Sequence, residues 1–536
     1  MTDFDGNPNG QIPTPNKIPN SKSQSYSATP RTKGAGIIGW NFGFGGLLGI
    51  GRWDLGFPAR PLPRILAPLF LLIGLAPLHA SPDDDAKRYP TVSGIDFSKF
   101  PKPPGPPTGR ALHVAPGGRG GDGSAGRPFD SILPALRKAA AGDVLLLHAG
   151  RYPLPEPAVI ETDGLRIAAA GDGPVTVVPE GGNGEAFVIH GDRVVLEGFT
   201  VEGFKGSVIT FGRTDRTQKD VVISKLVVKG GTDAFRSVVS DGNSKRPLLS
   251  GLLLSDVRIE GATLVGFNIG EGPVTDVRLE KVTVAMPRGD SGNSGADAVA
   301  VERGDNILIR GCDIAGASAD GIDLKATRVA VYDTVIHDVG RNGVKFWHGG
   351  DLVNSLVHHT GADAAIVLDG GGTYRILHTI VAFHAPGGEA YTLTCAYDHP
   401  DEKSDLTIAN SIFYKNAGPV WVSRGTTLRV TRSLFTGARG GTELVLQKKG
   451  DAELSVEDDG GWKALEKAGI AEGNLPMTAA PLFADEAKGD YRLKPGSPGI
   501  DAGAPAKEAY PPSDRLGAKR VQGRAPDLGP VEGAAR

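Results

Sequence analysis

The sequence predicts an all-β fold, a parallel β-helix solenoid with a capping helix at its N-terminal end. Three observations predict it: a repeat of 21–23 residues, three short β-patterned runs in each repeat, and almost no helical periodicity between them. A leucine-rich repeat has a similar period, but its regular leucine framework is missing here. A solenoid coil buries its apolar stripe only when the next coil stacks on it, so the repeat predicts one continuous core.

The N-terminal hundred residues are expected to lie outside this core. Residues 1–59 form an extension of uncertain role, of which 1–33 have the polar composition of a disordered segment. Segment 60–80 resembles a signal peptide, because Arg60 and Arg64 precede the apolar run 65–78 and a small residue, Ala80, follows it. It predicts a secreted, periplasmic or cell-surface protein, although an uncleaved anchor or a buried apolar segment is also consistent with it. Residues 81–110 are a proline-rich linker.

The solenoid is expected over residues 111–440, in roughly ten coils. A short strand at 112–114 opens it, and an amphipathic helix follows near 130–141 with Asp130 or Ser131 as its N-cap. That helix would cover the open edge of the first coil. Short alternating strands then recur until a second helical pattern at 462–468, and residues 441–536 are expected to close the C-terminal end.

The register of the repeat is clearest from residue 296 onward. Asp297, Asp320, Asn342 and Asp363 start equivalent runs and lie 23, 22 and 21 residues apart. Alternation along a strand then sends every second residue inward. The side chains expected to point inward are Val299, Val301, Ile322, Leu324, Val344, Phe346, Ile366 and Leu368. The outward side chains form two columns, Ala300–Asp323–Lys345–Val367 and Glu302–Lys325–Trp347–Asp369, which Asn268 and Trp421 would extend.

Segments at both ends of the predicted solenoid resemble a known superfamily. The opening stretches 113–116, 127–131, 141–145 and 149–152 and the closing stretches 481–483, 491–493, 496–503 and 526–530 carry the likeness. They resemble right-handed parallel β-helix proteins of the pectate-lyase-like superfamily, of the exported bacterial type. The Asp-Leu-Gly-Pro sequence at 527–530 departs from the usual Asp-Ile-Gly-Ala ending. The resemblance is specific for fold and weak for activity, because this fold carries lyases, hydrolases, epimerases and non-enzymatic adhesins.

The outward patch suits β-elimination of an acidic polysaccharide that contains uronate residues. The reaction needs a cation or donors on the carboxylate, a base for the carbon proton and an acid for the leaving group. By the resemblance to Ca²⁺-dependent lyases, Lys345 is the expected base and Lys325 a second base or carboxylate clamp. The same resemblance makes Glu302, Asp323 and Asp369 the expected Ca²⁺ ligands, and carboxylate oxygens suit that ion. Trp347, His348 and Trp421 are the expected substrate-binding residues.

Other interpretations of these residues stay open. Exposed Lys–Asp neighbours across coils are ordinary ion pairs in any solenoid, so a non-catalytic surface or carbohydrate-binding protein is the main alternative. A glycoside hydrolase is less favoured, because its Asp-Asp pair would be Asp458-Asp459, outside the regular coils. Asp320 and Asn342 are expected to stabilise turns, and His337 and His358 to form a surface ladder. A groove walled by loops 213–220, 241–246, 287–294 and 398–404 would favour the enzyme.

Composition limits the partners. The 58 basic and 61 acidic residues give a net charge of −3, so nucleic acid is not an expected partner. The apolar run 65–78 is shorter than the ~20 residues that span a bilayer, and we expect no stable membrane span. Two cysteines, Cys312 and Cys395, exclude a disulfide scaffold but leave one bond open. We expect a monomer that binds an acidic polysaccharide.

Overall fold

The structure is a computed structural model of the whole chain, which divides into two compact units, Met1–Ala76 and Pro77–Arg536. It describes residues 94–117, 120–182, 184–239, 245–270, 272–287, 295–385, 390–447, 453–481, 483–504 and 511–533. All of them belong to the second unit. The N-terminal extension 1–59 and the signal-peptide-like segment 60–80 lie outside the described residues. Within those residues, no helix has the length and apolar character needed to cross a membrane.

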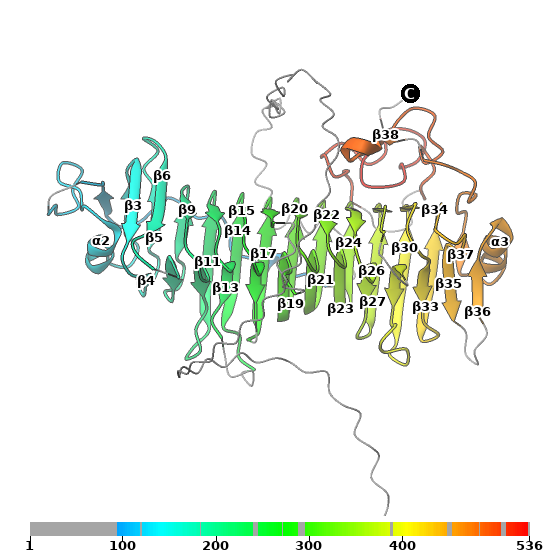
Figure 1. Ribbon diagram of the computed structural model, residues 1–536, viewed down its shortest axis with the longest axis horizontal. Helices are drawn as coiled ribbons and strands as arrows, with labels where there is room; N and C mark the ends of the chain where they lie inside the picture. The colour runs from blue at the N-terminus through cyan, green and yellow to red at the C-terminus, as the bar shows by residue number, and fades with distance from the viewer. Residues whose placement is uncertain are drawn as a thin grey trace, which may run out of the picture. The chain divides into compact units, whose positions relative to one another are not determined.

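The described strands stack as the coils of a right-handed parallel β-helix, as the repeat predicted (Figure 1). Each coil contributes one strand to each of three ladders, named here the site, strap and tail ladders. The site ladder consists of β4 (Ala158–Ile160), β7 (Phe187–Ile189), β10 (Ile209–Phe211), β13 (Asp233–Ser237), β16 (Val265–Ile269), the first part of β19 (Val299–Arg310) and of β21 (Ile322–Tyr332), β23 (Val344–His348), β26 (Ala364–Leu368), β29 (Tyr391–Cys395), β32 (Val420–Val422) and β35 (Leu444–Gln447).

The other two ladders complete each coil. The strap ladder consists of β1 (Ala111–Val114), β2 (Val144–Leu147), β5 (Arg166–Ala169), β8 (Val195–Glu197), β11 (Gln218–Ser224), β14 (Leu249–Ser255), β17 (Val274–Glu280), the second part of β19 and of β21, β24 (Gly350–Val353), β27 (Gly372–Leu377), β30 (Ser404–Ala409), β33 (Thr426–Thr431) and β37 (Ala471–Glu472). The tail ladder consists of β3 (Gly150–Leu154), β6 (Val175–Pro179), β9 (Thr200–Glu202), β12 (Val227–Lys229), β15 (Arg258–Glu260), β18 (Thr283–Ala285), β20 (Asp313–Ala315), β22 (Val335–Val339), β25 (Leu356–Thr360), β28 (Ile380–Ala382), β31 (Ile412–Tyr414) and β34 (Leu434–Thr436).

Two long strands join the site and strap ladders. β19 and β21 run on from one ladder into the next, so the two ladders form a single sheet, which has 25 strands with β36 (Glu453–Val456) and lies beside the 12-stranded sheet of the tail ladder. The tail ladder therefore counts twelve coils in the described part of the chain, more than the ten expected. Between the strap and tail ladders the chain turns at one left-handed residue in each coil, such as Asn354 and Asn410, both with φ of 53°. Asparagine is one of the few non-glycine residues that adopts this conformation at low cost.

The inside of the coils is apolar throughout. The eight inward side chains expected from alternation are all at most 1% exposed, which confirms the predicted strand phase. Rings stack from coil to coil, as in Phe413 and Phe435, whose centroids lie 4.6 Å apart in parallel planes. This continuous core holds the outward side chains of neighbouring coils at a fixed spacing of about 4.8 Å.

A helix lies at each end of the stack. α2 (Ile132–Lys138) packs Ile132 and Ala135 against the first coil, with Ser131 as its N-cap residue. α3 (Asp459–Lys467) buries Trp462 and Leu465 at the other end, beside the short antiparallel pair of β35 and β36 (Glu453–Val456). The Trp462 ring lies 5.0 Å from that of Phe435. Both helices cover open coil edges, where unpaired strands would otherwise be exposed.

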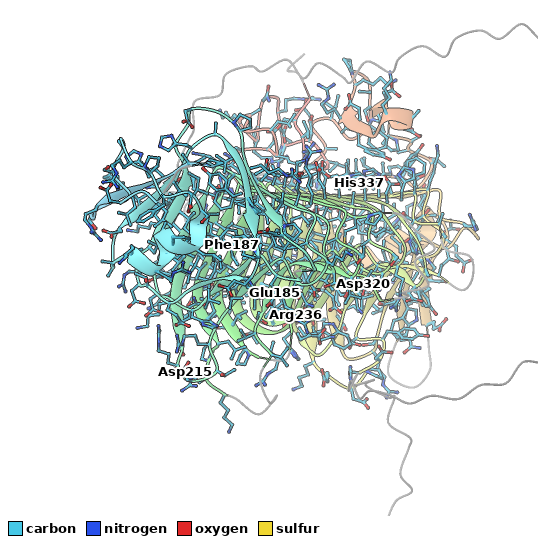
Figure 2. All side chains as sticks on the ribbon, turned by 60° about the vertical axis from the view of Figure 1, so that its left-hand side comes forward. Glu185, Phe187, Asp215, Arg236, Asp320 and His337 are labelled. Atoms are coloured by element: carbon cyan, nitrogen blue, oxygen red, sulfur yellow. The ribbon has the colours of Figure 1, made fainter. Side chains whose placement is uncertain are left out.

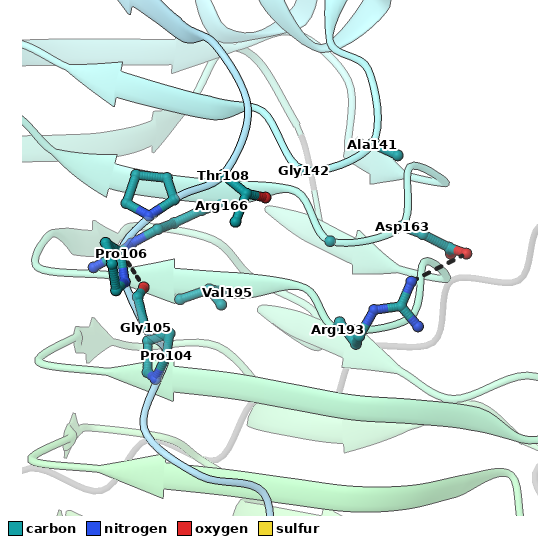
Figure 3. Close-up of a pocket in the computed structure, with 12 residues that line it drawn as sticks. Pro104, Gly105, Pro106, Thr108, Ala141, Gly142, Asp163, Arg166, Arg193 and Val195 are labelled. Carbon is teal, nitrogen blue, oxygen red and sulfur yellow. Dashed lines mark hydrogen bonds and ion pairs between the residues drawn. The ribbon is translucent and has the colours of Figure 1, made fainter.

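The described part of the predicted linker, residues 94–110, is a strap along the outside of the strap ladder. It includes η1 (Phe97–Lys99) and packs Ile95, Phe97 and Phe100 against outward residues such as Tyr332. From there it runs back toward the first coil, where Gly109 N donates to Gly142 O at 2.9 Å. Figure 3 shows the strap from Pro104 to Thr108 beside β5 and β8, with Arg166 donating to Gly105 O at 3.2 Å. The segment is therefore part of the fold, because its apolar residues cover outward apolar positions.

The C-terminal segment 473–533 also folds back along the coils instead of closing their end. It contains β38 (Phe483–Asp485), η2 (Glu486–Lys488) and β39 (Asp490–Leu493), and β38 lies over the later coils in Figure 1. Phe483, Tyr491 and Leu493 cover outward apolar residues of the tail ladder, namely Leu356, Ile380, Ile412 and Leu434. Of residues 441–536, the part up to β37 lies at the C-terminal end of the coils. The segment after β37 packs on the outward apolar residues of the tail ladder, which would otherwise be exposed to water.

Candidate functional site

The outer face of the site ladder carries polar side chains. The outer faces of the other two ladders carry apolar residues, which the strap and the C-terminal segment cover. The strand register aligns one outward column along this face, which contains Arg236, Asn268, Ala300, Asp323, Lys345, Val367, Thr394 and Trp421. This agrees with the column expected from alternation. In Figure 2, Glu185, Arg236 and Asp320 follow one another along one side of the coils, while His337 lies on another side.

Lys345 lies at the centre of an acidic cluster in this column. Its Nζ is 3.0 Å from Asp320 Oδ2 and 3.4 Å from Asp323 Oδ2. Its side chain is only 15% exposed, whereas the sequence suggested an ordinary exposed strand lysine. Lys345 thus lies on the same face as Asp323 and Val367, as expected, but is an ion-paired and largely buried group.

Asp297 and Asp320 join the site through the starts of their strands. Asp297 Oδ1 accepts a hydrogen bond from Asp320 N at 2.9 Å, and Asp320 Oδ1 accepts bonds from Asn342 N and Nδ2 at 3.1 and 2.8 Å. The sequence assigned Asp320 and Asn342 to turns, which they do stabilise. It missed that the second oxygen of Asp320 reaches Lys345. In three neighbouring coils a polar residue lies three positions before the outward column, and in two of them it is an aspartate, Asp297 and Asp320. This repeated acid was the signal that could have placed Asp320 at the site.

Lys325, Glu302 and Trp347 flank the cluster in the next outward column. Lys325 Nζ lies 2.8 and 2.6 Å from the two Glu302 oxygens and 3.6 Å from Asp323 Oδ2. The Trp347 indole Nε1 donates to Asp323 Oδ1 at 3.0 Å. Both ammonium groups approach the indole ring, at 6.0 Å for Lys325 and 5.7 Å for Lys345. The structure therefore brings together Lys345, Lys325, Asp323, Glu302 and Trp347 as the sequence predicted.

The charges and the burial of the cluster shift the pKa values of its lysines and of Asp297. Burial alone would lower the pKa of Lys345, but the Asp323 and Asp320 carboxylates outweigh it and raise that pKa above its usual value. The pKa of Lys325 is raised in the same way, by Asp323 and Glu302 against the effect of burial. Burial, and next the negative charge of Asp320, raise the pKa of Asp297 to about 7. The cluster therefore has more negative charge than its two lysines neutralise.

This excess charge fits a divalent cation. Asp297, Asp320 and Asp323 each offer one oxygen, and these oxygens lie within 4.8 Å of one another. Carboxylate oxygens are the donors that Ca²⁺ prefers, and crowded carboxylates gain most from a cation. A cation there would share Asp320 and Asp323 with the Lys345 ammonium. Of the three residues expected as ligands, Asp323 belongs to this group, whereas Glu302 and Asp369 make other contacts.

Asp369 and His348 lie beside the cluster with partners of their own. Asp369 is 1% exposed, and its carboxylate accepts from Gly370 N at 2.9 Å and lies 3.2 Å from His399 Nδ1. His348 is exposed, with Nδ1 at 3.1 Å from Gly370 O. Trp421 lies in the same outward column as Lys345, three coils further along, and is packed among tyrosine rings.

Other residues that the sequence singled out have structural roles. Asp458 caps α3, accepting from Gly460 N and Gly461 N at 2.8 and 3.0 Å, so the Asp458-Asp459 pair is part of a helix start. His337 and His358 stack across one coil of the tail ladder with centroids 5.0 Å apart. His358 is buried under Tyr491, whereas the His337 side chain is 25% exposed, so Tyr491 covers only the His358 side of this expected surface ladder. Cys312 and Cys395 are both buried and free, with no disulfide between them.

A family model agrees with the fold. The sequence model of the family described as a right-handed β-helix region matches residues 291–457, which include the acidic cluster. No curated protein matches the chain. Among solved structures, the chain is similar to pectate lyase Pel9A, with 14% identity over 82% of this chain and 98% of that chain and a TM-score of 0.40.

The chain is also similar to two further solved structures. The complex of XylC with xylose shows 10% identity over 78% of this chain and 98% of that chain, with a TM-score of 0.47. The A-module of the mannuronan C-5 epimerase AlgE4 from Azotobacter vinelandii shows 15% identity over 59% of this chain and 93% of that chain, with a TM-score of 0.40. At these identities the likeness concerns the fold, and the chemistry of this chain rests on its own residues.

Proposed function

Because the chain is a right-handed parallel β-helix protein, we propose that the polar face of its site ladder binds carbohydrate, and that it cleaves uronate-containing polysaccharide by β-elimination. The observation that carries the proposal is the meeting of two lysines, three aspartates and an indole on one face. β-Elimination needs a base that takes the proton from the carbon beside the carboxylate, and positive charge on that carboxylate. The bond from carbon to the 4-linked oxygen breaks as the double bond forms, and the leaving oxygen takes a proton from the protonated base or from solvent. The signal-peptide-like segment 60–80 fits an enzyme that acts on such a polymer outside the cell.

Lys345 is the proposed base and Lys325 the carboxylate clamp. A base must be neutral to accept a proton, and the carboxylates of Asp323 and Asp320 now hold the pKa of Lys345 above its usual value. Lys325 keeps its charge through Glu302 and is half-buried beside Trp347, which suits it to an anionic group of a sugar ring. The Trp347 ring would pack against the sugar itself.

A bound divalent cation would neutralise the substrate carboxylate in this reaction. Asp297, Asp320 and Asp323 are the residues that would hold it. Neutralising Asp320 and Asp323 removes the two charges that raise the pKa of Lys345, so the lysine would lose its proton at a lower pH. Activity should therefore require the cation and increase toward alkaline pH.

The test is a panel of pectate, alginate and chondroitin polymers, followed by the absorbance of the unsaturated product in the ultraviolet. Lys345→Ala should abolish the product, and Lys345→Arg should not restore it, because arginine stays protonated. Lys415→Ala is the matched control, since Lys415 also pairs with a carboxylate, Glu486, and lies over an aromatic ring, but on the tail ladder. Full activity of a folded Lys345→Ala protein would remove this residue from the mechanism.

A non-catalytic carbohydrate-binding role is the second candidate, and one observation favours it. Both lysines already form ion pairs within the cluster, Lys325 with Glu302 and Lys345 with Asp320, so neither ammonium needs a reaction to explain its position. A binding protein would retain polymers in affinity electrophoresis without releasing any unsaturated product. Retention without product, with and without added Ca²⁺, would favour this candidate over the lyase.

A further inference from the structure

Three aromatic side chains gather on the site ladder beyond the acidic cluster. The Trp421 ring on β32 lies 4.9 Å from the Tyr397 ring and 6.4 Å from the Tyr391 ring, and the two tyrosines lie 5.4 Å apart. The register runs from Lys345 through Val367 and Thr394 to Trp421, so this aromatic group is three coils from Lys345. Three coil spacings place it about 14 Å further along the axis.

Tyr397 leaves a large apolar surface open to solvent. It is 45% exposed, one of few large hydrophobic side chains so exposed among the described residues. Its ring contacts those of Trp421, which is 9% exposed, and Tyr391, which is half-buried. A rigid aromatic ring at this position has a face available for a ligand at little cost in conformational entropy.

A buried carboxylate holds the loop that carries Tyr397. The loop connects β29 to β30, and Asp398 N donates to Asp369 Oδ2 at 3.3 Å. His399 Nδ1 lies 3.2 Å from the other oxygen of the same carboxylate. Asp369 itself directly follows β26, one coil nearer to Lys345, and is 1% exposed. This anchor fixes the start of the loop, and with it the Tyr397 ring above Trp421.

We infer that Tyr397, Trp421 and Tyr391 form an aromatic subsite for a second sugar ring of the same acidic polysaccharide, and that Asp369 is a positioning residue for it. The inference rests on the proposed function, whose reaction centre lies on the same face. Apolar ring faces of sugars pack on aromatic side chains, whereas the charged groups of a uronate chain suit the lysines of the cluster. A chain that reaches both must be an oligosaccharide, since the two groups are three coils apart.

The inference gives Asp369 a role other than the metal ligand that the sequence suggested. Its oxygens face the loop through Asp398 and His399, and it lies outside the group of Asp297, Asp320 and Asp323. Removing its charge should loosen the loop and act through Tyr397. The two residues should therefore show coupled effects on binding.

The experiment compares long and short oligomers of polygalacturonate and alginate with the full-length protein. Tyr397→Ala should raise KM for long oligomers about three- to tenfold, the range of one aromatic contact, and leave kcat nearly unchanged. Short oligomers that fill only the acidic cluster should show no change. Asp369→Asn should have a similar effect, and the double variant should be little worse than either single one. Leu516→Ala is the control, because Leu516 is 54% exposed on the C-terminal segment.

The outcomes separate this inference from the lyase proposal. If the wild type cleaves the polymers and Tyr397→Ala changes KM equally for long and short oligomers, or for neither, the subsite is overturned. The lyase proposal is unaffected by that result. If no polymer is cleaved, affinity electrophoresis with the same polymers replaces KM, and retention that Tyr397→Ala selectively weakens would support the subsite alone. A wild-type protein that neither cleaves nor retains any of them would overturn both.

Discussion

The Lys345 ammonium and the Asp320 carboxylate form an ion pair between neighbouring coils, with Nζ and Oδ2 3.0 Å apart. Their side chains are 15% and 3% exposed, so the pair lies mostly out of water. Asp323 shares the same ammonium at 3.4 Å. A lysine in this position contributes to the fold as well as to any chemistry, because removing it strips the counter-ion from a buried carboxylate.

We therefore expect Lys345→Ala to lower the free energy of unfolding by about 1–3 kcal/mol, the cost of leaving a buried charged partner unsatisfied. Urea denaturation followed by tryptophan fluorescence would measure it. Lys345→Met keeps most of the apolar stem and should separate the loss of packing from the loss of charge. An unchanged midpoint for both variants would mean that the Lys345 pair adds nothing to stability.

The stacked histidines of the tail ladder should respond to acid in opposite ways. Burial, and next the charges of His337 and His359, lower the pKa of His358 to about 3. Stability from neutral His358 is thus present above about pH 6.5 and is lost as the pH falls toward 3. Hydrogen bonding to Asp313, and to Asp338 against the effect of burial, raises the pKa of His337. Its stabilisation is present below about pH 6.5 and is lost as the pH rises through the raised value.

Melting curves between pH 7 and pH 4 test this pair. His358→Phe keeps a ring in the stack but has no proton to gain, so its melting temperature should fall less with acid than that of the wild type. His337→Phe should fall more, because it lacks the ion pairs with Asp313 and Asp338. Parallel curves for all three proteins would contradict the assignment.

A buried ion pair within the C-terminal segment holds the arginine that donates to the coils. Arg520 Nη1 lies 2.9 Å from Glu532 Oε1, both side chains are 1% exposed, and Arg520 also donates to Asn354 of the coils. Arg520→Ala should destabilise the docked segment by about 3–5 kcal/mol, whereas Arg520→Met combined with Glu532→Leu should cost much less. Hydrogen exchange of residues 511–533 would measure both. Equal protection in the single and double variants would contradict the pairing argument.

The N-terminal strap should depend on its aromatic residues. Phe97 is 5% exposed and packs with Tyr332 and other outward residues of the strap ladder. Phe97→Ala removes contacts worth up to about 3–5 kcal/mol, enough to release the strap locally. Trypsin should then cut faster after the exposed Lys99, while the coils stay intact. Val159→Ala, at an exposed position on another ladder, should leave the cutting rate unchanged.

The sequence predicted the coils well because their signals are local and repeated. Alternation around Val344 and Phe346 fixed the phase of the strand, and the 21–23-residue spacing aligned Asp323 with Lys345. The same signals could not show that a long side chain on one outward column contacts a residue outside that column. Lys345 reaches back to Asp320, and Asp297 becomes part of the cluster only through the backbone of its neighbour.

Segments without a repeat were harder to place. The proline-rich stretch before residue 111 has the composition of a linker, yet Phe97 and Phe100 make it a strap. Asp369 occupies the register position of an outward ligand, and its contacts with Asp398 and His399 depend on the path of a loop without periodicity. Such contacts link distant parts of the chain and leave no pattern in the sequence.

The position of the strap has a kinetic consequence. Asp96 N donates to Asn306 Oδ1 at 2.9 Å, across 210 residues of sequence, whereas neighbouring coils meet at separations near 22 residues. Closing so long a loop is entropically unfavourable until its docking surface exists, and that surface includes β19 and β21. Coils with short-range contacts can form in succession, and the strap joins last although it is synthesised first. Refolding should therefore show a fast phase from coil growth and a slow one that reports burial of Phe97.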